Sequence, residues 1–231
     1  MEYKKIGLNK RSFSADAKRT NDELIKYFEE AENLLYWTES ESMVLIEGPQ
    51  KSGKTRLAFE VVENHKGEGK VIYLDQNTYN REIDISYLLM ANQGFFRKFL
   101  NKKPKDMILI LDNVINMDND FFKRIQYYYD QGYLKSVIFI KKAGVELKLP
   151  KSILSRIGHK KVKLEALKKD ECLEIAHERL RNFMDYKHLE KVWAYSKNLE
   201  TLLKNAQLVA DEFIIKDRKK LDMKFIDKVL K

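Results

Sequence analysis

Eight consecutive residues restrict most strongly what this chain can fold into. Residues 48–55 read Gly-Pro-Gln-Lys-Ser-Gly-Lys-Thr, which fits the phosphate-binding pattern G-x-x-x-x-G-K-[ST]. A glycine-rich turn allows backbone N–H groups to surround phosphate oxygens, and a following helix directs its positive end at the anion. An apolar run of strand type precedes the motif at 43–47, and a helical pattern follows at 56–62. The context is therefore strand, loop and helix, as this mechanism requires.

The motif also predicts which side chains contact a nucleotide. Lys54 is expected to reach the β- and γ-phosphates, and Thr55 to give its hydroxyl to Mg²⁺. The implied ligands are ATP or ADP together with Mg²⁺. The expected nucleotide-contacting set is the whole loop and the residue after it: Gly48, Pro49, Gln50, Lys51, Ser52, Gly53, Lys54, Thr55 and Arg56.

A second motif lies at the end of an almost entirely apolar run. Residues 106–112 are typical of a parallel strand buried on both faces, and the run ends with Asp112. In nucleotidases that carry the first motif, a carboxylate at this place serves Mg²⁺ and neutralises developing phosphate charge. Thr55 and Asp112 are therefore the predicted metal-binding residues. The alternative for Asp112 is a helix cap or a turn residue after a strand.

Asn113 follows Asp112, where many enzymes of this type carry a glutamate that activates water. An amide cannot usefully accept a proton at neutral pH. Asn113 is thus a candidate catalytic position with an unexpected side chain. Either another group orients the water, or hydrolysis is slow.

The rest of the chain predicts two domains. Strand patterns alternate with helical ones as far as about residue 166, which favours an α/β fold with a parallel sheet. No strand pattern remains after that point. The expected strands are 43–47, 70–75, 106–112, 136–140 and 161–164, and the expected helices are 22–35, 56–62, 84–100, 119–129, 169–183, 186–195, 199–213 and 223–230. The predicted domains are 1–166, which includes an N-terminal helical segment at 1–40, and an all-helical domain at 167–231.

Composition narrows the class of protein and its partners. The formal charge is +9 over 231 residues, which favours an anionic partner such as DNA. The lysines are spread along the chain, so a solvated basic surface is an equal alternative. The single cysteine, Cys172, excludes an internal disulfide and is expected to be buried. No apolar stretch is long enough for a membrane span, and no signal-peptide core is present, so a cytoplasmic location without membrane partners is expected.

An α/β domain with the phosphate motif, followed by a helical lid, resembles the AAA+ ATPases. Residues 149–158, 161–167 and 170–180 are similar to the segment that joins the fourth strand to the lid in archaeal origin-recognition initiators and clamp loaders. There a Ser-Arg pair precedes the fifth strand, and its arginine reaches the γ-phosphate of a neighbouring subunit. The resemblance implies that Arg156 is an arginine finger. The alternative is a surface arginine paired with a carboxylate. The winged-helix domain that usually follows the lid in those initiators is not expected here.

Three positions depart from the usual pattern of that family. Lys141 and Lys142 follow the fourth strand, where Asn, Thr or Ser usually senses the nucleotide. Glu200 stands where a lid arginine often contacts phosphate, and a carboxylate there would repel it. Asn113 replaces the catalytic glutamate. These departures support nucleotide binding more than turnover.

Two functions from different classes follow from these patterns. The leading prediction is an ATPase that acts on DNA in replication initiation, transposition or maintenance of a mobile element, through nucleotide-dependent assembly or closure. It would assemble as a homo-oligomer or with a partner ATPase. The alternative is a nucleotide-gated switch or adaptor that binds ATP with little hydrolysis. A small-molecule kinase is less favoured, because residues 150–156 and the helical tail do not resemble its arginine-rich lid.

Overall fold

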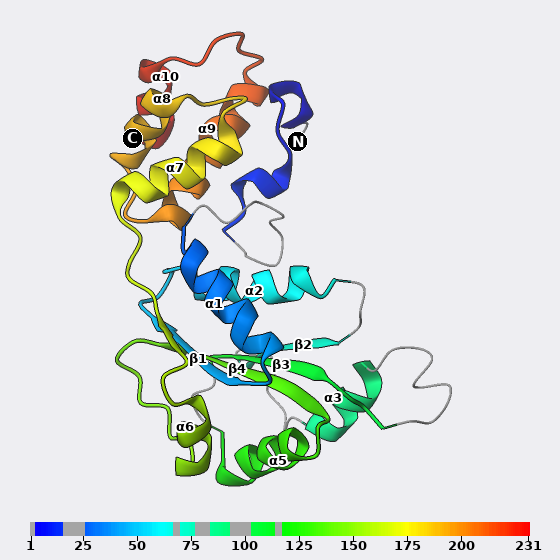
Figure 1. Ribbon diagram of the computed structural model, residues 1–231. Coiled ribbons are helices and arrows are strands. Elements are labelled where there is room, and N and C mark those ends of the chain that lie inside the picture. Colours follow the sequence, from blue (N-terminus) through cyan, green and yellow to red (C-terminus); the bar gives the residue numbers. More distant parts are fainter. Residues whose placement is uncertain (1–2, 16–25, 67–69, 77–83, 93–102, 114–116) are drawn as a thin grey trace. The chain divides into compact units, whose positions relative to one another are not determined.

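The computed structural model describes residues 3–15, 26–66, 70–76, 84–92, 103–113 and 117–231 (Figure 1). The chain divides into two compact units. The first, Tyr27–Glu165, is named here the α/β unit. The second combines Met1–Lys26 with Ala166–Lys231 and is named the helical unit.

The α/β unit contains a sheet of five parallel strands in the order β2-β3-β4-β1-β5. The strands are β1 (Met43–Gly48), β2 (Val71–Asp75), β3 (Met107–Asp112), β4 (Leu134–Lys142) and β5 (Lys161–Lys163). Every position of β3 is buried, as expected for a parallel strand covered on both faces. The predicted α/β fold with a parallel sheet and a following helical region is confirmed.

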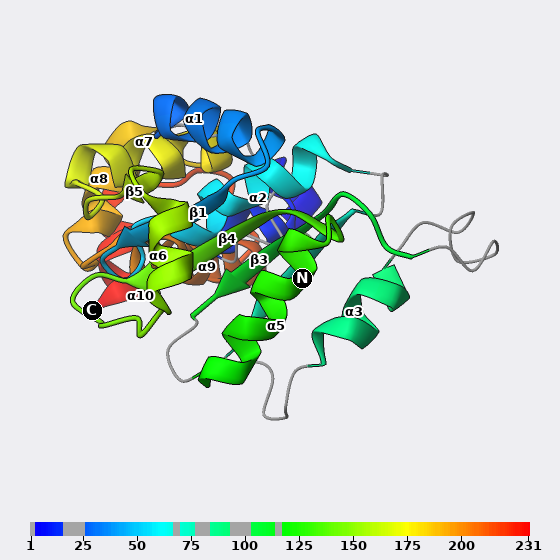
Figure 2. The same ribbon diagram turned by 60° about the horizontal axis from the view of Figure 1, so that its bottom comes forward.

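Helices cover both faces of this sheet (Figures 1 and 2). The helices α1 (Phe28–Glu39) and α2 (Lys54–Asn64) lie on one face. The helices α3 (Ile85–Asn92), α5 (Asn119–Asp130) and α6 (Lys151–Ile157) lie on the other. The α/β unit is therefore a three-layer sandwich with the sheet in the middle.

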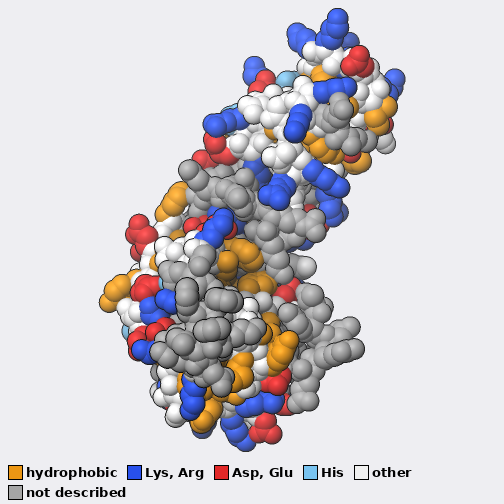
Figure 3. All heavy atoms as spheres, turned by 90° about the vertical axis from the view of Figure 1, so that its right-hand side faces the viewer, with side chains coloured by type: hydrophobic (Ala, Val, Ile, Leu, Met, Phe, Trp, Pro, Cys, Tyr) orange, Lys and Arg blue, Asp and Glu red, His pale blue; other side chains and the backbone are white. Residues whose placement is uncertain are grey.

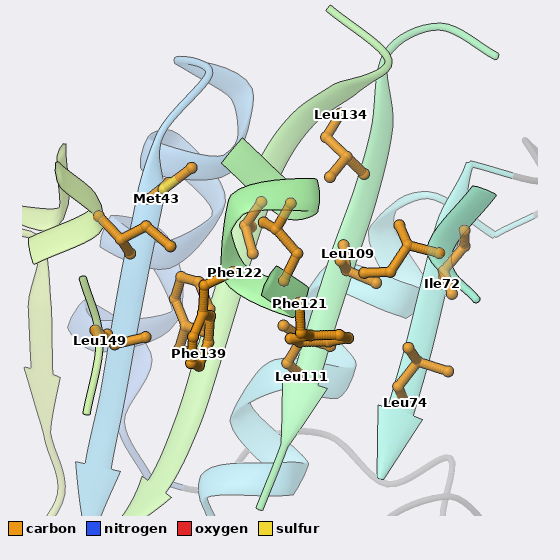
Figure 4. Packing of buried hydrophobic residues seen from close by; sticks show 14 of the residues in the cluster. Met43, Ile72, Leu74, Leu109, Leu111, Phe121, Phe122, Leu134, Phe139 and Leu149 are labelled. Atoms are coloured by element: carbon orange, nitrogen blue, oxygen red, sulfur yellow. The ribbon is translucent and has the colours of Figure 1, made fainter. Parts of the chain in front are cut away.

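A hydrophobic core cluster of the α/β unit lies between the sheet and the helices α3, α5 and α6. Figure 4 shows Phe121 and Phe122 of α5 directed at side chains of the strands, and the rings of Phe122 and Phe139 have centroids 6.4 Å apart. Burying one such side chain contributes about 1.5–3 kcal/mol. Because a shift of one residue would turn these side chains to the opposite face, the core also fixes the register of the strands.

Three helices of the α/β unit differ from the predicted pattern. The helix expected at 22–35 begins only at Phe28, because Tyr27 has a left-handed backbone with φ of 69°; residues 16–25 lie outside the described residues. The helix expected at 84–100 is described as far as Asn92, and 93–102 lie outside the described part. The short helix α6 was not predicted, and Pro150 precedes its first turn.

The helical unit contains the four helices that the sequence predicts. They are α7 (Lys169–Leu180), α8 (Tyr186–Trp193), α9 (Leu199–Ile215) and α10 (Met223–Leu230). Three of them begin with a side chain that accepts a hydrogen bond from a backbone N–H three residues later: Asp185, Asn198 and Asp222. Cys172 is buried in this unit as expected, and burial raises the pKa of its thiol to about 11. Among the described residues, no helix is both long and apolar enough to span a membrane.

The N-terminal segment corrects the predicted domain assignment, which placed residues 1–40 in the α/β domain. Its short 3-10 helices η1 (Tyr3–Ile6) and η2 (Lys10–Phe13) pack in the core of the helical unit. The Tyr3 hydroxyl donates to Asp211 Oδ1 at 2.5 Å, and Arg179 donates to the carbonyl of Ser14 at 2.8 Å. Phe13 is buried there as well. The reason is that Tyr3, Leu8 and Phe13 bury apolar area against the helical unit's core, a tertiary contact that no local pattern reveals.

Candidate phosphate-binding site

The candidate site lies at the carboxyl edge of the sheet. Gly48, Asp75, Asp112 and Lys142 are the last residues of β1, β2, β3 and β4. Gly48 is the register partner of Lys142, and Asp75 is the partner of Asp112. Ligands of open α/β sheets bind outside this edge. The strand ends therefore bring one glycine, two carboxylates and one lysine to the same place.

Two glycines allow the loop after β1 to adopt its shape. A Cβ atom at Gly48 would lie 2.7 Å from the carbonyl oxygen of Leu164 and 2.8 Å from Ser52 Oγ, so no larger residue fits without movement. Gly53 has φ of 94° and precedes the first turn of α2. Lys51 is exposed and also has a positive φ, of 65°. Because the loop is this tight, its backbone can approach a ligand closely.

Lys54 is held inside the loop at the first position of α2. Its Nζ donates to the carbonyl oxygens of Gly48 at 3.0 Å and Pro49 at 2.5 Å. Burial lowers the pKa of Lys54, the charge of Asp112 opposes this change, and the charge of Lys142 adds to it. Phosphate oxygens would be stronger acceptors for the Lys54 ammonium than these neutral carbonyls, because they carry negative charge.

Asp112 is 3% exposed and accepts two hydrogen bonds on one oxygen. Thr55 Oγ1 donates to Asp112 Oδ2 at 2.7 Å, and the Tyr73 hydroxyl donates to the same atom at 2.6 Å. Burial, and then the hydrogen bond to Asp112, raise the pKa of Tyr73. The predicted metal residues Thr55 and Asp112 are thus adjacent. Two hard oxygen donors fit Mg²⁺, which commonly takes one or two protein ligands and completes its shell with water and phosphate.

Ser52 adds a further indication of a missing polar partner. Its side chain is fully buried, and within the described part of the chain Ser52 Oγ has no hydrogen-bond partner. A buried hydroxyl without a partner is unfavourable by about 1–3 kcal/mol. A bound anion with several acceptor oxygens is the kind of group that such a loop could satisfy.

Asn113 is directed towards the neighbouring strand. Its Nδ2 donates to Asp75 Oδ1 at 3.0 Å, and its backbone has a left-handed φ of 58°. The sequence motif relates Asn113 only to its neighbour Asp112. The structure instead pairs it with a second carboxylate at the same edge.

The two lysines at the end of β4 have different surroundings. Lys141 Nζ lies 3.0 Å from Glu47 Oε2 and donates to the carbonyl of Val145, and Lys163 of β5 lies 3.6 Å from Glu47 Oε1. The hydrogen bond from Lys141 lowers the pKa of Glu47. Lys142 is exposed and is the register partner of Gly48, the first residue of the loop. Of the two, Lys142 is therefore the lysine available to a ligand.

Two predicted arginines pair with carboxylates in the α/β unit. Arg56 forms an ion pair of 2.5 Å with Glu60 along α2. Arg156 of α6 lies 2.7 Å from Asp130, and its guanidinium stands over the ring of Tyr129. This is the geometry of the alternative stated for Arg156. A role towards a neighbouring subunit stays a prediction.

Glu200 lies in the helical unit, in the first turn of α9. Its Oε1 is 2.6 Å from Lys204 Nζ on the same helix. An acidic residue at this place is favourable because the N-terminus of a helix carries partial positive charge. Its position is thus explained by the helix itself.

Sequence reasoning missed three residues near the loop. Tyr73 and Asp75 both lie on β2, and Asp75 ends an apolar strand just as Asp112 does, so a signal for it was present. Tyr27 had none. A Cβ at Gly53 would lie 3.8 Å from Tyr27 Cε2, and the Tyr27 hydroxyl donates to the carbonyl of Glu165 at 2.9 Å.

Comparisons with known proteins agree with this geometry. A solved structure of the Orc1 protein of Aeropyrum pernix in complex with DNA has a TM-score of 0.71 and 15% identity, over 96% of this chain and 68% of that one. Cdc6p of Pyrobaculum aerophilum has a TM-score of 0.67 and 13% identity, over 96% of this chain and 72% of that one. Domain III of the Thermotoga maritima replication initiation protein DnaA has a TM-score of 0.62 and 17% identity, over 97% of this chain and 99% of that one. At these identities the likeness establishes the fold alone.

Curated protein sequences give no match to this chain. The family model described as AAA domain matches residues 40–168, which is more than half of the chain and includes the loop and the strand ends described above. The phosphate loop, the parallel sheet and this match lead to one conclusion: the chain belongs to the AAA domain family and is an AAA+ P-loop ATPase that resembles archaeal initiators.

Proposed function

We propose that this chain binds ATP with Mg²⁺ at the carboxyl edge of its sheet and hydrolyses it slowly or on stimulation by a partner. The observation that carries the proposal is the Gly48–Thr55 loop, with Lys54 inside it and Thr55 bonded to Asp112. Backbone N–H groups of the loop would bind phosphate oxygens, and Lys54 would neutralise charge on the β- and γ-phosphates. Lys142 would add a second positive charge beside them.

Thr55 and Asp112 would hold the metal ion through one hydroxyl and one carboxylate. Mg²⁺ supplies charge neutralisation on the phosphate oxygens when it is bound. The protein's own part is to orient these two oxygens. Tyr73 contributes to that orientation, because its hydroxyl donates to the same oxygen of Asp112 as Thr55 does.

We further propose that the protein acts on DNA. The chain has a net charge of +9, and on the face shown in Figure 3 Lys and Arg side chains are spread over the helical unit. Solved neighbours include an Orc1 protein in complex with DNA and a Drosophila ORC bound to DNA; the latter has a TM-score of 0.60 at 14% identity, over 90% of this chain and 61% of that one. Replication initiation, transposition and maintenance of a mobile element are the processes that this reading covers.

ATP-dependent assembly is the proposed way in which nucleotide affects DNA. Arg156 of one subunit would reach the nucleotide bound by a second copy of this chain, or by a partner ATPase, after its ion pair with Asp130 opens. A guanidinium suits this role because it is always charged and binds two phosphate oxygens at once. Cytoplasmic localisation is part of the same proposal.

A second function, a nucleotide-gated switch or adaptor with little hydrolysis, is favoured by one observation. Asn113 carries an amide at the position next to Asp112, and that amide donates to Asp75. In this reading ATP would alter the surface that the protein presents to a partner, and no base would be required at the site.

One set of measurements tests these proposals. Equilibrium titration with ATP, with and without Mg²⁺, tests binding, and steady-state ATPase assays with and without double-stranded DNA test turnover. We expect binding that strengthens with Mg²⁺ and turnover that rises with DNA, and DNA affinity that falls steeply with salt. ATP binding without turnover under either condition supports the switch, and absence of ATP binding contradicts both functions.

A further inference from the structure

Asp75 and Asn113 form a pair of side chains at the carboxyl edge that the functional roles assigned above do not use. Asn113 Nδ2 donates to Asp75 Oδ1 at 3.0 Å. Asp75 is the register partner of Asp112 on the adjacent strand. Neighbouring strands are about 4.8 Å apart, so a second carboxylate stands one strand away from the carboxylate that binds Thr55.

Asp75 faces the side of the sheet on which the phosphate loop opens into α2. Side chains two residues apart on a strand share a face, so Asp75 points to the same side as Tyr73. The Tyr73 ring lies 5.2 Å from the ring of Phe59, which belongs to α2, and its hydroxyl reaches Asp112. Asp112 therefore accepts from Tyr73, and Asp75 lies two residues further along the same face of β2.

The backbone at Asn113 explains why an amide occupies this position. Its φ of 58° lies in the left-handed region, which asparagine tolerates better than most other residues. A glutamate here would be strained, and its carboxylate would meet that of Asp75. The amide avoids both problems, because it donates a hydrogen bond to a carboxylate that is already present.

We propose that Asp75 is the general base of ATP hydrolysis in this chain and that Asn113 is the positioning residue that holds its carboxylate. The inference rests on the proposed function, because it requires ATP in the phosphate loop. An amide cannot take a proton from water at neutral pH, whereas the Asp75 carboxylate can. The carboxylate that Asn113 lacks is thus supplied from the neighbouring strand.

The step conserves atoms and charge. The oxygen of a water molecule forms a bond to the γ-phosphorus while the bond from that phosphorus to the β–γ bridging oxygen breaks. The bridging oxygen keeps the electron pair and leaves with ADP. One proton of the water passes to a carboxylate oxygen of Asp75, which later releases it to solvent, and inorganic phosphate is the second product.

The first test is Asp75→Asn in the full chain. The amide has nearly the shape of the carboxylate and keeps an oxygen that accepts from Asn113. We expect kcat to fall about 100-fold or more, the range of general-base catalysis, with the Kd for ATP unchanged. If Asp75 takes the proton, kcat of the wild type is expected to rise with pH on the acid side, and this rise is expected to be absent in Asp75→Asn. Asp120→Asn is the matched control, because Asp120 is an exposed carboxylate on α5, at the opposite face, and kcat is expected to stay the same.

A second variant separates positioning from proton transfer. Asn113→Ala keeps the Asp75 carboxylate and removes the group that holds it, so we expect a smaller fall in kcat and an acid-side rise that remains. Unchanged kcat in Asp75→Asn, or in Asn113→Ala if Asp75→Asn does not fold, overturns the inference. Tight ATP binding by the wild type without turnover, with or without DNA, overturns it while leaving nucleotide binding intact. Absence of ATP binding overturns the proposed function as well.

Discussion

Buried polar side chains distinguish the α/β unit from the helical unit. Among the described residues, the buried polar or charged ones are Thr38, Ser42, Ser52, His65, Asp112 and Ser136, and all of them belong to the α/β unit. The buried side chains described in the helical unit are hydrophobic ones. A buried polar group is unfavourable unless it is paired, so its presence requires a reason.

The reasons differ within the α/β unit. Ser136 donates to the carbonyl of Ser42 and Thr38 donates to that of Leu34 at 2.7 Å, so these hydroxyls bond to backbone groups. Ser52 and Asp112 lie instead at the phosphate loop, where a charged ligand would complete their contacts. The comparison shows that each unit has an apolar core, and that among the described residues only the α/β unit also buries polar side chains, two of them at the loop proposed to bind phosphate.

The largest expected effect is that of Lys54→Ala on ATP affinity. Each hydrogen bond to a charged group contributes about 1.5–3 kcal/mol, and Lys54 is expected to bind more than one phosphate oxygen. We expect binding to be lost in a titration, with no loss of folding because alanine suits the first turn of α2. Lys66→Ala, an exposed lysine of the same unit, is the control. If Lys54→Ala binds ATP with near-normal affinity, the loop is not part of the ATP-binding site.

The next effect tests which unit contains the N-terminal segment. Phe13→Ala and Phe122→Ala each remove a buried ring, at an expected cost of about 3–5 kcal/mol of folding stability. The chain has two tryptophans, Trp37 in the α/β unit and Trp193 in the helical unit, so single-tryptophan variants report each unit separately. We expect Phe13→Ala to lower the unfolding midpoint followed by the fluorescence of Trp193. We expect Phe122→Ala to lower the midpoint followed by the fluorescence of Trp37. A shift of the Trp37 midpoint by Phe13→Ala would instead indicate that the N-terminal segment packs in the α/β unit.

A smaller effect distinguishes the two glycines of the loop. Gly48→Ala forces a Cβ against the Leu164 carbonyl and Ser52, and we expect it to lower stability by about 1–3 kcal/mol and to weaken ATP binding. Gly53→Ala meets no atom closer than 3.8 Å, so its expected cost of about 1–2 kcal/mol comes from the positive φ alone. Denaturant unfolding and ATP titration measure both. Equal effects on binding would mean that the contact with Leu164 is unimportant.

The smallest expected effect is a shift along the pH axis. Burial lowers the pKa of Lys54, while bound phosphate would favour its charged form. ATP affinity should therefore fall as pH rises through the pKa of Lys54 in the free protein. Because the charge of Lys142 lowers that pKa further, Lys142→Ala should move the fall in affinity to higher pH. Lys141→Ala serves as the control, since Lys141 pairs with Glu47; a shift of similar size there would exclude the specific role of Lys142.

The sequence predicted most of the sheet because its signals are local, and the proposed site rests on equally local signals. The loop motif and the apolar run to Asp112 each lie within eight residues. The helices of the helical unit were predicted well for the same reason, since a helix cap such as Asn198 bonds to a backbone N–H only three residues away. Even so, β4 extends two residues beyond the prediction at each end, because strand ends depend on the neighbouring strands.

Contacts between distant residues could not be predicted in this way. Tyr3 and Asp211 are 208 positions apart, so no pattern in either segment indicates that they meet. The bond between Asn113 and Asp75 depends on strand order and register, which a single sequence does not reveal. The ion pair between Arg156 and Asp130 likewise depends on how two helices pack.

The surroundings of the loop have a mechanical consequence. The chain passes between the two units at residues 26–27 and 165–166. Tyr27 lies beside Gly53, Leu164 lies against Gly48, and the Tyr27 hydroxyl bonds to the carbonyl of Glu165. One connection therefore begins beside Gly53 and the other beside Gly48, and a hydrogen bond joins the two. Because the Tyr27 hydroxyl bonds to the Glu165 carbonyl, displacing either of these two chain segments would disturb the contact that holds the other.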